Sequence, residues 1–163
     1  MSTKKDKFSA KDKNYMKLAI NLARARKGLT GENPSVGCVI VKNDNIISIG
    51  QTGFNGRPHA ETHAINNCFQ SLKGSKIYIT LEPCSHYGKT PPCTNIIKNK
   101  KIKKVFYSIN DIDERSKNKS QKALSKKNIS ISKFFLKEKA IKFYESYHRL
   151  RKDKLPVIDA KLA

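Results

Sequence analysis

Four residues of the chain have the types and the spacing of a catalytic metal site. His59, Cys84 and Cys93 offer one imidazole and two thiolates, a ligand set typical of a zinc ion that keeps its fourth position open for water. The two thiolates balance the charge of the ion, and such a site still lowers the pKa of a bound water. Glu61 follows the histidine by two residues, where its carboxylate could take a proton from that water and pass it to a leaving group. The set therefore predicts zinc-dependent hydrolysis, with Glu61 as the proton carrier.

The separation of His59 and Glu61 restricts where the two residues can lie. Residues two apart on a regular helix point about 200° away from each other. The two side chains can therefore share a pocket only if His59 stands at the very start of a helix, and Pro58 favours a helix start there. A competing pair, His59 and His63, could hold a metal on one helix face, but the metalloprotease pattern needs Glu directly after the first His, where this chain has Ala60. We expect His63 to face solvent.

Helical and strand patterns alternate along the chain, and they determine where these residues lie. A short apolar run of the kind expected for a strand covered on both faces is followed by a turn and a return strand, and the strand that delivers Cys84 comes later. Such alternation predicts a three-layer α/β/α arrangement, in which a mixed, mainly parallel sheet has helices on both faces and ligands bind at the carboxyl ends of strands. The predicted helices are 9–28, 58–72, 92–100, 116–125 and 138–150, and the predicted strands are 36–41, 46–50, 76–80, 105–109 and 129–135.

Composition indicates a single globular domain with few further clues to function. The chain has 163 residues and a formal charge of +21, but its lysines are spread along the sequence and do not alternate with aromatic residues as in single-stranded nucleic-acid binding proteins. The charge is thus weak evidence for a phosphorylated ligand, and no nucleic acid is expected as a partner. No apolar stretch approaches the roughly 18–20 residues that span a bilayer, so no membrane association is expected. Four cysteines without a secretory signal indicate a reducing cytoplasm.

Changes in composition suggest three regions. Residues 1–11 form a basic N-terminal tail, and residues 12–150 carry all the chemistry-bearing motifs. A charged spacer and a new strand-like run follow at 151–163, which we interpret as a linker and the start of a second domain that the chain lacks. Cys38 and Cys68 are predicted to be core residues, and His148 has no evident partner.

The interval between the two cysteines is the most specific feature. Base and nucleoside deaminases that act on tRNA adenosine or cytidine place both thiolates in a tight PCxxC turn. Here the motif is PCSHYGKTPPC, with residues 85–92 between the cysteines. Together with NPSVGCVIV at 33–41 and GRPHAET at 56–62, the segment TLEPCSHYGKTPPC closely resembles the deaminase domain of riboflavin biosynthesis, a member of the cytidine deaminase-like superfamily. The resemblance covers about residues 12 to 163.

The resemblance implies both a fold and a reaction. It implies a cytidine deaminase-like fold, a Zn²⁺ cofactor, and hydrolytic removal of the amino group of diaminohydroxyphosphoribosylaminopyrimidine as ammonia, which leaves 5-amino-6-(5-phosphoribosylamino)uracil. It also implies a homo-oligomer, because relatives associate through this domain. For the substrate, it implies contacts from Asn33 to the pyrimidine or ribose, and from His86 and Lys89 to the ligand. Ser85 adds a hydrogen-bond donor beside the metal.

Two positions depart from the family pattern. Many members carry a histidine seven residues before the zinc histidine, and this chain has Thr52 there. The family turn DPNP is replaced by residues 111–114, which keep Asp111 but have Asp113 in place of the asparagine. We predict that both aspartates contact the substrate. Asp113 could accept hydrogen bonds from ribose hydroxyls but, unlike an amide, could not donate them.

Two alternatives stay open. The first is a nucleic-acid or nucleoside deaminase acting on tRNA adenosine or cytidine, against which the long interval between the cysteines argues. The second is a non-catalytic binding protein in which zinc only stabilises the fold.

Overall fold

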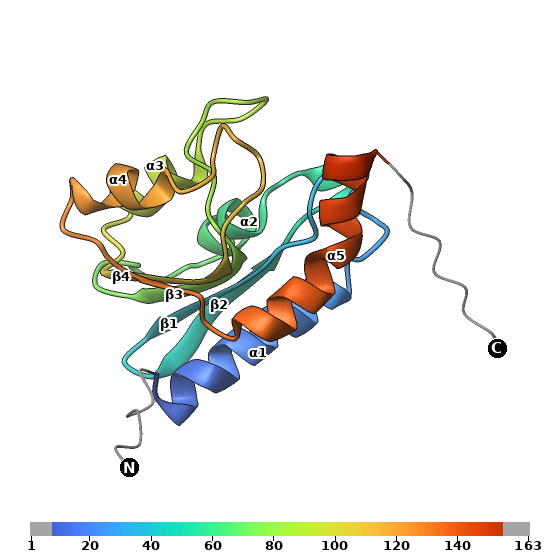
Figure 1. Ribbon diagram of the computed structural model, residues 1–163. Helices are drawn as coiled ribbons and strands as arrows, with labels where there is room; N and C mark the ends of the chain where they lie inside the picture. The colour runs from blue at the N-terminus through green and yellow to red at the C-terminus, as the bar shows by residue number, and fades with distance from the viewer. Residues whose placement is uncertain (1–7, 155–163) are drawn as a thin grey trace, which may run out of the picture.

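The computed structural model describes residues 8–154, which form a five-stranded sheet between two layers of helices (Figure 1). The chain order alternates as the sequence predicts, and a one-turn 3₁₀ helix (η1) precedes α2. The elements are α1 (Ala10–Arg24), β1 (Gly37–Lys42), β2 (Asn45–Gln51), η1 (Phe54–Gly56), α2 (Ala60–Asn66), β3 (Lys76–Leu81), α3 (Cys93–Asn99), β4 (Lys104–Ile109), α4 (Ser120–Ser125), β5 (Ser130–Lys133) and α5 (Lys137–Asp153).

The sheet is mixed, and its strand order is β2-β1-β3-β4-β5. Strand β1 runs antiparallel to both of its neighbours, whereas β3, β4 and β5 are parallel to one another. Because β1 alone is reversed relative to the other four strands, the prediction of a mixed, mainly parallel sheet is confirmed. The run at 36–41 is almost wholly buried, as expected for a strand covered on both faces.

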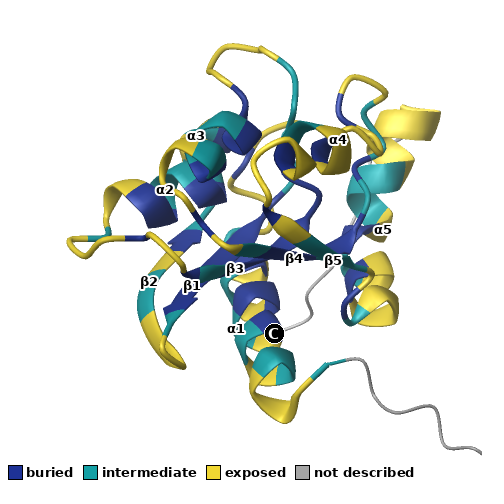
Figure 2. Ribbon diagram, turned by 90° about the vertical axis from the view of Figure 1, so that its left-hand side faces the viewer, coloured by how far each residue is buried: buried dark blue, intermediate teal, exposed yellow. Residues whose placement is uncertain are grey.

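The helices divide between the two faces of the sheet (Figure 2). Helices α2, α3 and α4 cover one face, where Ile79 and Tyr107 belong to the larger buried cluster. Helices α1 and α5 lie side by side on the other face, where Tyr78 and Phe106 stack with their ring centroids 4.5 Å apart (Figure 1). The predicted three-layer arrangement is therefore confirmed. None of the described helices is both long enough and apolar enough to cross a membrane.

The first and last helices extend past the predicted domain limits. The predicted cap of α1 is confirmed, since Ser9 and Asp12 form a reciprocal capping box. The helix begins at Ala10, two residues before the predicted start of the domain at residue 12. Arg151 to Asp153 form the last turn of α5 instead of a spacer, because lysine and arginine are good helix formers and are favoured at a helix C-terminus. The basic tail before residue 8 and the strand-like run at 155–163 lie outside the described residues.

Three helices are clearly shorter than their sequence patterns predict, and the first of them, α1, ends at Arg24 instead of continuing to residue 28. Helix α2 ends at Asn66 instead of continuing to residue 72, since asparagines 66 and 67 favour a helix end over its interior. Helix α4 begins only at Ser120, after a turn in which Asn118 adopts a positive φ of 60°. Helices α2 and α4 lie on the same face of the sheet, and α1 lies on the other (Figure 2).

Candidate active site

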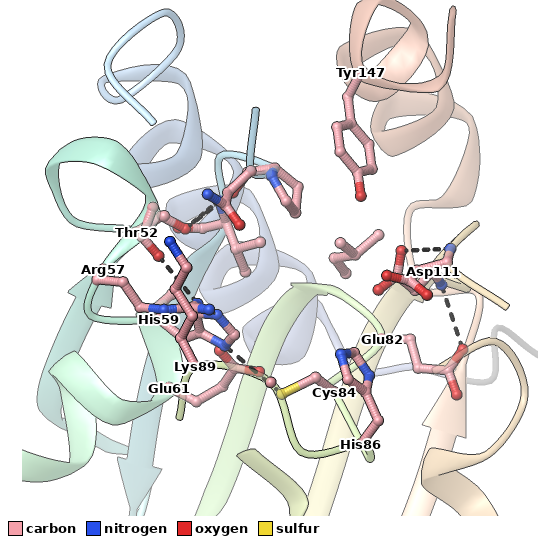
Figure 3. Close-up of a pocket in the computed structure, with 18 of the residues that line it drawn as sticks. Thr52, Arg57, His59, Glu61, Glu82, Cys84, His86, Lys89, Asp111 and Tyr147 are labelled. Carbon is pink, nitrogen blue, oxygen red and sulfur yellow. Dashed lines mark hydrogen bonds between the residues drawn. The ribbon is translucent and has the colours of Figure 1, made fainter. Parts of the chain in front are cut away.

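A cavity of about 300 Å³ opens where β3 and β4 end, and it contains most of the predicted site (Figure 3). Leu81, Glu82 and Cys84 line it from the end of β3, and Asp111 lines it from the segment after β4. The polar side chains thus gather at the carboxyl ends of parallel strands, as expected for this kind of sheet.

The start of α2 explains how the side chains of His59 and Glu61, two residues apart, can reach the same pocket. His59 is the N-cap residue of α2, and its extended backbone (φ −65°, ψ 152°) frees its side chain from the helical repeat. Glu61 lies in the first helical turn, is 4% exposed, and reaches the same pocket. The prediction that His59 stands at the very start of the helix is confirmed. Pro58, however, comes before the N-cap and not in the first turn.

The end of β3 and the start of α3 supply the two thiols. Cys84 follows β3, and Cys93 is the first residue of α3, directly after its N-cap Pro92. His59 Nδ1 lies 3.2 Å from Cys93 Sγ and 3.6 Å from Cys84 Sγ. The three ligand atoms all fall within 4.8 Å of one another, which suits a single tetrahedral metal ion. Their donor chemistry, one nitrogen and two sulfurs, also fits zinc.

Hydrogen bonds within this cluster favour the ionised form of the Cys84 thiol, whereas the hydrogen bond with Cys84 and burial raise the pKa of the Cys93 thiol. The Cys93 backbone N–H donates to Cys84 Sγ at 3.1 Å. Hydrogen bonds from Cys93 and from His59 lower the pKa of the Cys84 thiol to about 4. Burial alone would lower the pKa of His59, but its hydrogen bond with Cys84 and the negative charge of Glu61 raise it.

Glu61 has the protonation behaviour that a proton carrier requires. Burial raises the pKa of its carboxyl to about 7, although the nearby His59 opposes the increase. A carboxyl group of this kind can both accept and release a proton near neutral pH. In Figure 3, Glu61 lies next to His59 and Cys84.

Three of the predicted substrate contacts from the NPS segment and from the loop between the two cysteines line this cavity. Asn33, His86 and Lys89 all line it. His86 is fixed by a 2.8 Å hydrogen bond between its Nδ1 and Ser116 Oγ. Ser85 does not line the cavity, and its hydroxyl is buried without a hydrogen-bond partner among the described residues.

The two aspartates also line the cavity, but their surroundings differ. Asp111 is 8% exposed, and burial raises the pKa of its carboxyl to about 6. Asp113 forms a salt bridge with Arg115, which lowers the pKa of Asp113 to about 2. Its carboxylate therefore has a protein partner already, a feature that the sequence did not predict.

Several pocket residues were missed by the sequence analysis. Glu82 stands between the strand and Cys84 in the motif LEPC, and the residue is 3% exposed. It accepts hydrogen bonds from the backbone of Asp111 and Asn118 and from both the N–H and the hydroxyl of Ser120. A charged residue at the end of an apolar strand was the available signal for it. The charged and aromatic pocket residues that were also missed are Arg57, Arg115, Tyr147 and Arg151.

Most of the residues that were predicted to lie outside the site do lie outside it. Cys38 is fully buried in the core, as predicted. Cys68 is partly buried, beyond the end of α2, and its thiol contacts the Ile47 carbonyl. The prediction for His63 is wrong: its ring is partly buried, with Nδ1 at 3.1 Å from the Gln51 carbonyl, because the shortened α2 packs against β2. His148 stacks on Tyr144.

Thr52, which stands where the resemblance implied a histidine, fills a structural role. Its hydroxyl accepts the Val36 N–H at 2.9 Å and donates to the Pro34 carbonyl at 3.2 Å. The residue is 2% exposed and forms part of the pocket wall. It thereby holds the segment that carries Asn33.

Comparison with known proteins agrees with this geometry. Residues 9–109 match the family model of the cytidine and deoxycytidylate deaminase zinc-binding region. The chain is 39% identical over 146 residues to a diaminohydroxyphosphoribosylamino-pyrimidine deaminase of Buchnera aphidicola subsp. Schizaphis graminum, covering 90% of this chain and 99% of that protein. It is also 39% identical over 152 residues to the riboflavin biosynthesis protein RibD of Aquifex aeolicus, covering 93% of this chain but only 43% of RibD.

Solved structures give the same result. The crystal structure of a diaminohydroxyphosphoribosylaminopyrimidine deaminase/5-amino-6-(5-phosphoribosylamino)uracil reductase from Thermotoga maritima superposes with a TM-score of 0.81 at 36% identity, over 90% of this chain and 42% of that one. The chain therefore spans less than half the length of the Aquifex and Thermotoga relatives, but nearly the whole of the Buchnera protein. The chain belongs to the zinc-binding cytidine and deoxycytidylate deaminase family, within its riboflavin-biosynthesis branch.

Proposed function

We propose that the protein hydrolyses the amino group of diaminohydroxyphosphoribosylaminopyrimidine and releases ammonia and 5-amino-6-(5-phosphoribosylamino)uracil. The observation that carries this proposal is the convergence of His59, Cys84 and Cys93 beside the buried carboxylate of Glu61, in a pocket large enough for a nucleotide-like ligand. The name of the Buchnera relative, which this chain matches over nearly its whole length, supplies the substrate.

The side chains divide the work of the reaction. Zinc held by His59, Cys84 and Cys93 would supply Lewis acidity that makes a water molecule in the pocket more acidic. Glu61 would take a proton from that water as its oxygen adds to the carbon bearing the amino group. The same carboxyl would then deliver protons to the ring nitrogen and to the departing amine, so that one water replaces one ammonia.

The loop between the two zinc cysteines supports a small phosphorylated substrate over a nucleic acid. It places His86 and Lys89 in the pocket wall, and Ser116 fixes the ring of His86. We place the enzyme in the cytoplasm, where reducing conditions keep its free cysteines available as ligands.

A substrate panel tests the proposal. Ammonia release by the zinc-loaded protein would be measured with the ribosylaminopyrimidine phosphate, cytidine, deoxycytidylate and a tRNA. We expect turnover of the ribosylaminopyrimidine phosphate at a kcat/KM at least 100-fold above the others. Turnover of tRNA or cytidine alone would exclude the assignment, and no turnover of any substrate by the zinc-loaded protein would favour a binding protein.

A further inference from the structure

The pocket continues from the zinc ligands to a second group of charged side chains. The cavity lined by His59 and Cys84 is also lined by Arg115, Tyr147 and Arg151. Figure 3 shows Tyr147 and Asp111 on the opposite side of the pocket from His59 and Glu61. A ligand with its base at the metal could therefore extend toward this second group.

A series of three carboxylates orients Arg115, and the series starts inside the protein. Glu82, which is 3% exposed, accepts the Asp111 backbone N–H at 3.3 Å. Asp111 in turn accepts the Asp113 N–H at 3.1 Å. Asp113 then accepts the Arg115 N–H and Nε at 2.9 Å and Nη2 at 2.5 Å. Each carboxylate fixes the backbone of the next residue in the series, so the guanidinium is held in place although 62% of the Arg115 side chain is exposed.

The guanidinium retains donors for a ligand. Its hydrogen bonds with Asp113 use Nε and Nη2, and Nη1 takes no part in them. Helix α5 brings a second guanidinium to the same wall, since Arg151 lies one turn after Tyr147 and both residues line the pocket. Guanidinium groups match the oxygen geometry of phosphate better than ammonium groups do.

We propose that Arg115, oriented by Asp113 and joined by Arg151, binds the phosphate of the substrate and makes the enzyme select phosphorylated over dephosphorylated ribosylaminopyrimidine. This inference rests on the proposed function. It gives Asp113 a positioning role in place of the predicted ribose contact. The carboxylate that replaces the family's asparagine orients the Arg115 guanidinium toward the ligand.

The test compares two substrates, the phosphorylated pyrimidine and its dephosphorylated riboside, across matched variants. Arg115→Ala is expected to lower kcat/KM for the phosphorylated substrate by about 10–100-fold, mainly through KM, because charge-assisted hydrogen bonds are lost. The riboside should change by less than about twofold. Arg115→Lys should restore part of the preference, and Asp113→Asn should lose part of it.

The control is Arg149→Ala, which removes an exposed arginine of α5 that pairs with Glu145 outside the pocket. It should leave both substrates unchanged. Thermal melting and zinc content establish that each variant folds, and Arg115→Lys serves the comparison if the alanine variant does not.

The outcomes separate the two proposals. If the wild type turns over both substrates equally, or if Arg115→Ala slows both by the same factor, phosphate selection by Arg115 is wrong while the deaminase assignment stands. If the wild type turns over neither substrate, the proposed function fails. Calorimetry with ribose 5-phosphate then decides the inference alone: binding that Arg115→Ala weakens at least 10-fold supports it, and equal or absent binding overturns it.

Discussion

Glu61 is buried and lies in the pocket beside His59 and Cys84, which makes its replacement the most direct test of catalysis. Glu61→Gln keeps the size of the side chain but removes the exchangeable proton. We expect kcat to fall by about 10³–10⁴-fold, in line with the loss of a general acid–base that acts more than once per turnover. Zinc content and melting temperature should stay close to the wild type, as measured by metal analysis and circular dichroism. Turnover within tenfold of wild type would remove Glu61 from the mechanism.

Asp111 gives the stability of the fold a defined pH dependence. Burial raises the pKa of its carboxyl from 3.8 to about 6, and the Asp113 and Glu82 carboxylates add to the increase. The folded state therefore binds this proton more tightly than the unfolded state does, so the contribution to stability is full below pH 4 and is lost as the pH rises through 6.

Asp111→Asn should remove this dependence. The amide oxygen can still accept the Asp113 N–H, and it carries no charge that burial opposes. We expect about 1–2 kcal/mol of added stability at pH 7 and little change at pH 4, measured by urea denaturation at both values. An equal shift at the two pH values would mean that ionisation of Asp111 is not the cause.

The chemistry-bearing residues were predictable from the sequence where their residue types are rare and their spacing is narrow. His59, Cys84 and Cys93 lie close enough to share one metal ion, as predicted, and Glu61 lines the same pocket as His59 and Cys84, because the geometry of zinc restricts which residues can serve. Arg115 was not predictable, since one arginine among 34 basic residues gives no signal until the fold brings it to the cavity.

At the scale of elements, one carboxylate joins the end of β3 to the segment that leads into α4. Glu82 accepts hydrogen bonds from three residues, at 111, 118 and 120. Glu82→Gln would turn an amide N–H toward donors that need an acceptor. We expect a loss of about 1–3 kcal/mol of stability and a higher KM, because the segment carrying Asp111 and Asp113 is released.

Glu145→Gln provides the matched comparison for Glu82→Gln. Glu145 pairs with Arg149 on the exposed face of α5, and a surface ion pair of this kind contributes about 0–1 kcal/mol. Both variants would be measured by thermal melting and steady-state kinetics. If they lose the same stability and keep the same KM, Glu82 does not organise the pocket.

The strands were easier to predict than the helix ends. Strands β1, β3 and β4 begin and end within one residue of their predicted positions, because short apolar runs are bounded by polar residues on both sides. Helix α2 is shorter than predicted because its asparagines favour a helix end, whereas α4 is shorter because tertiary hydrogen bonds decide its start. At the start of α4, Ser120 bonds to Glu82 from another element, which no local pattern of residues reveals.

At the scale of the whole molecule, metal binding and folding should be coupled. The zinc ligands come from separate elements, so an ion that binds only the folded state stabilises it by mass action. Chelation should abolish ammonia release and lower the melting temperature by about 5–10 °C, which corresponds to roughly 2–3 kcal/mol for a domain of this size. Adding zinc should restore both. Full activity after complete metal removal would contradict a zinc-dependent mechanism.

Because the metal ligands come from separate elements, metal binding should also affect the proteolysis of the chain. A metal ion held at residues 59, 84 and 93 would act as a crosslink that closes two loops of the chain. The first loop contains α2 and β3, and the second, shorter loop contains the exposed residues 87–91. Proteases cleave exposed loops that can unfold locally. Fixing both ends of a short loop restricts its conformations, so the loop can no longer open to fit a protease. The same ion would thus protect the backbone at 87–91 from cleavage, and resistance to digestion would follow metal occupancy even in a variant that has no turnover.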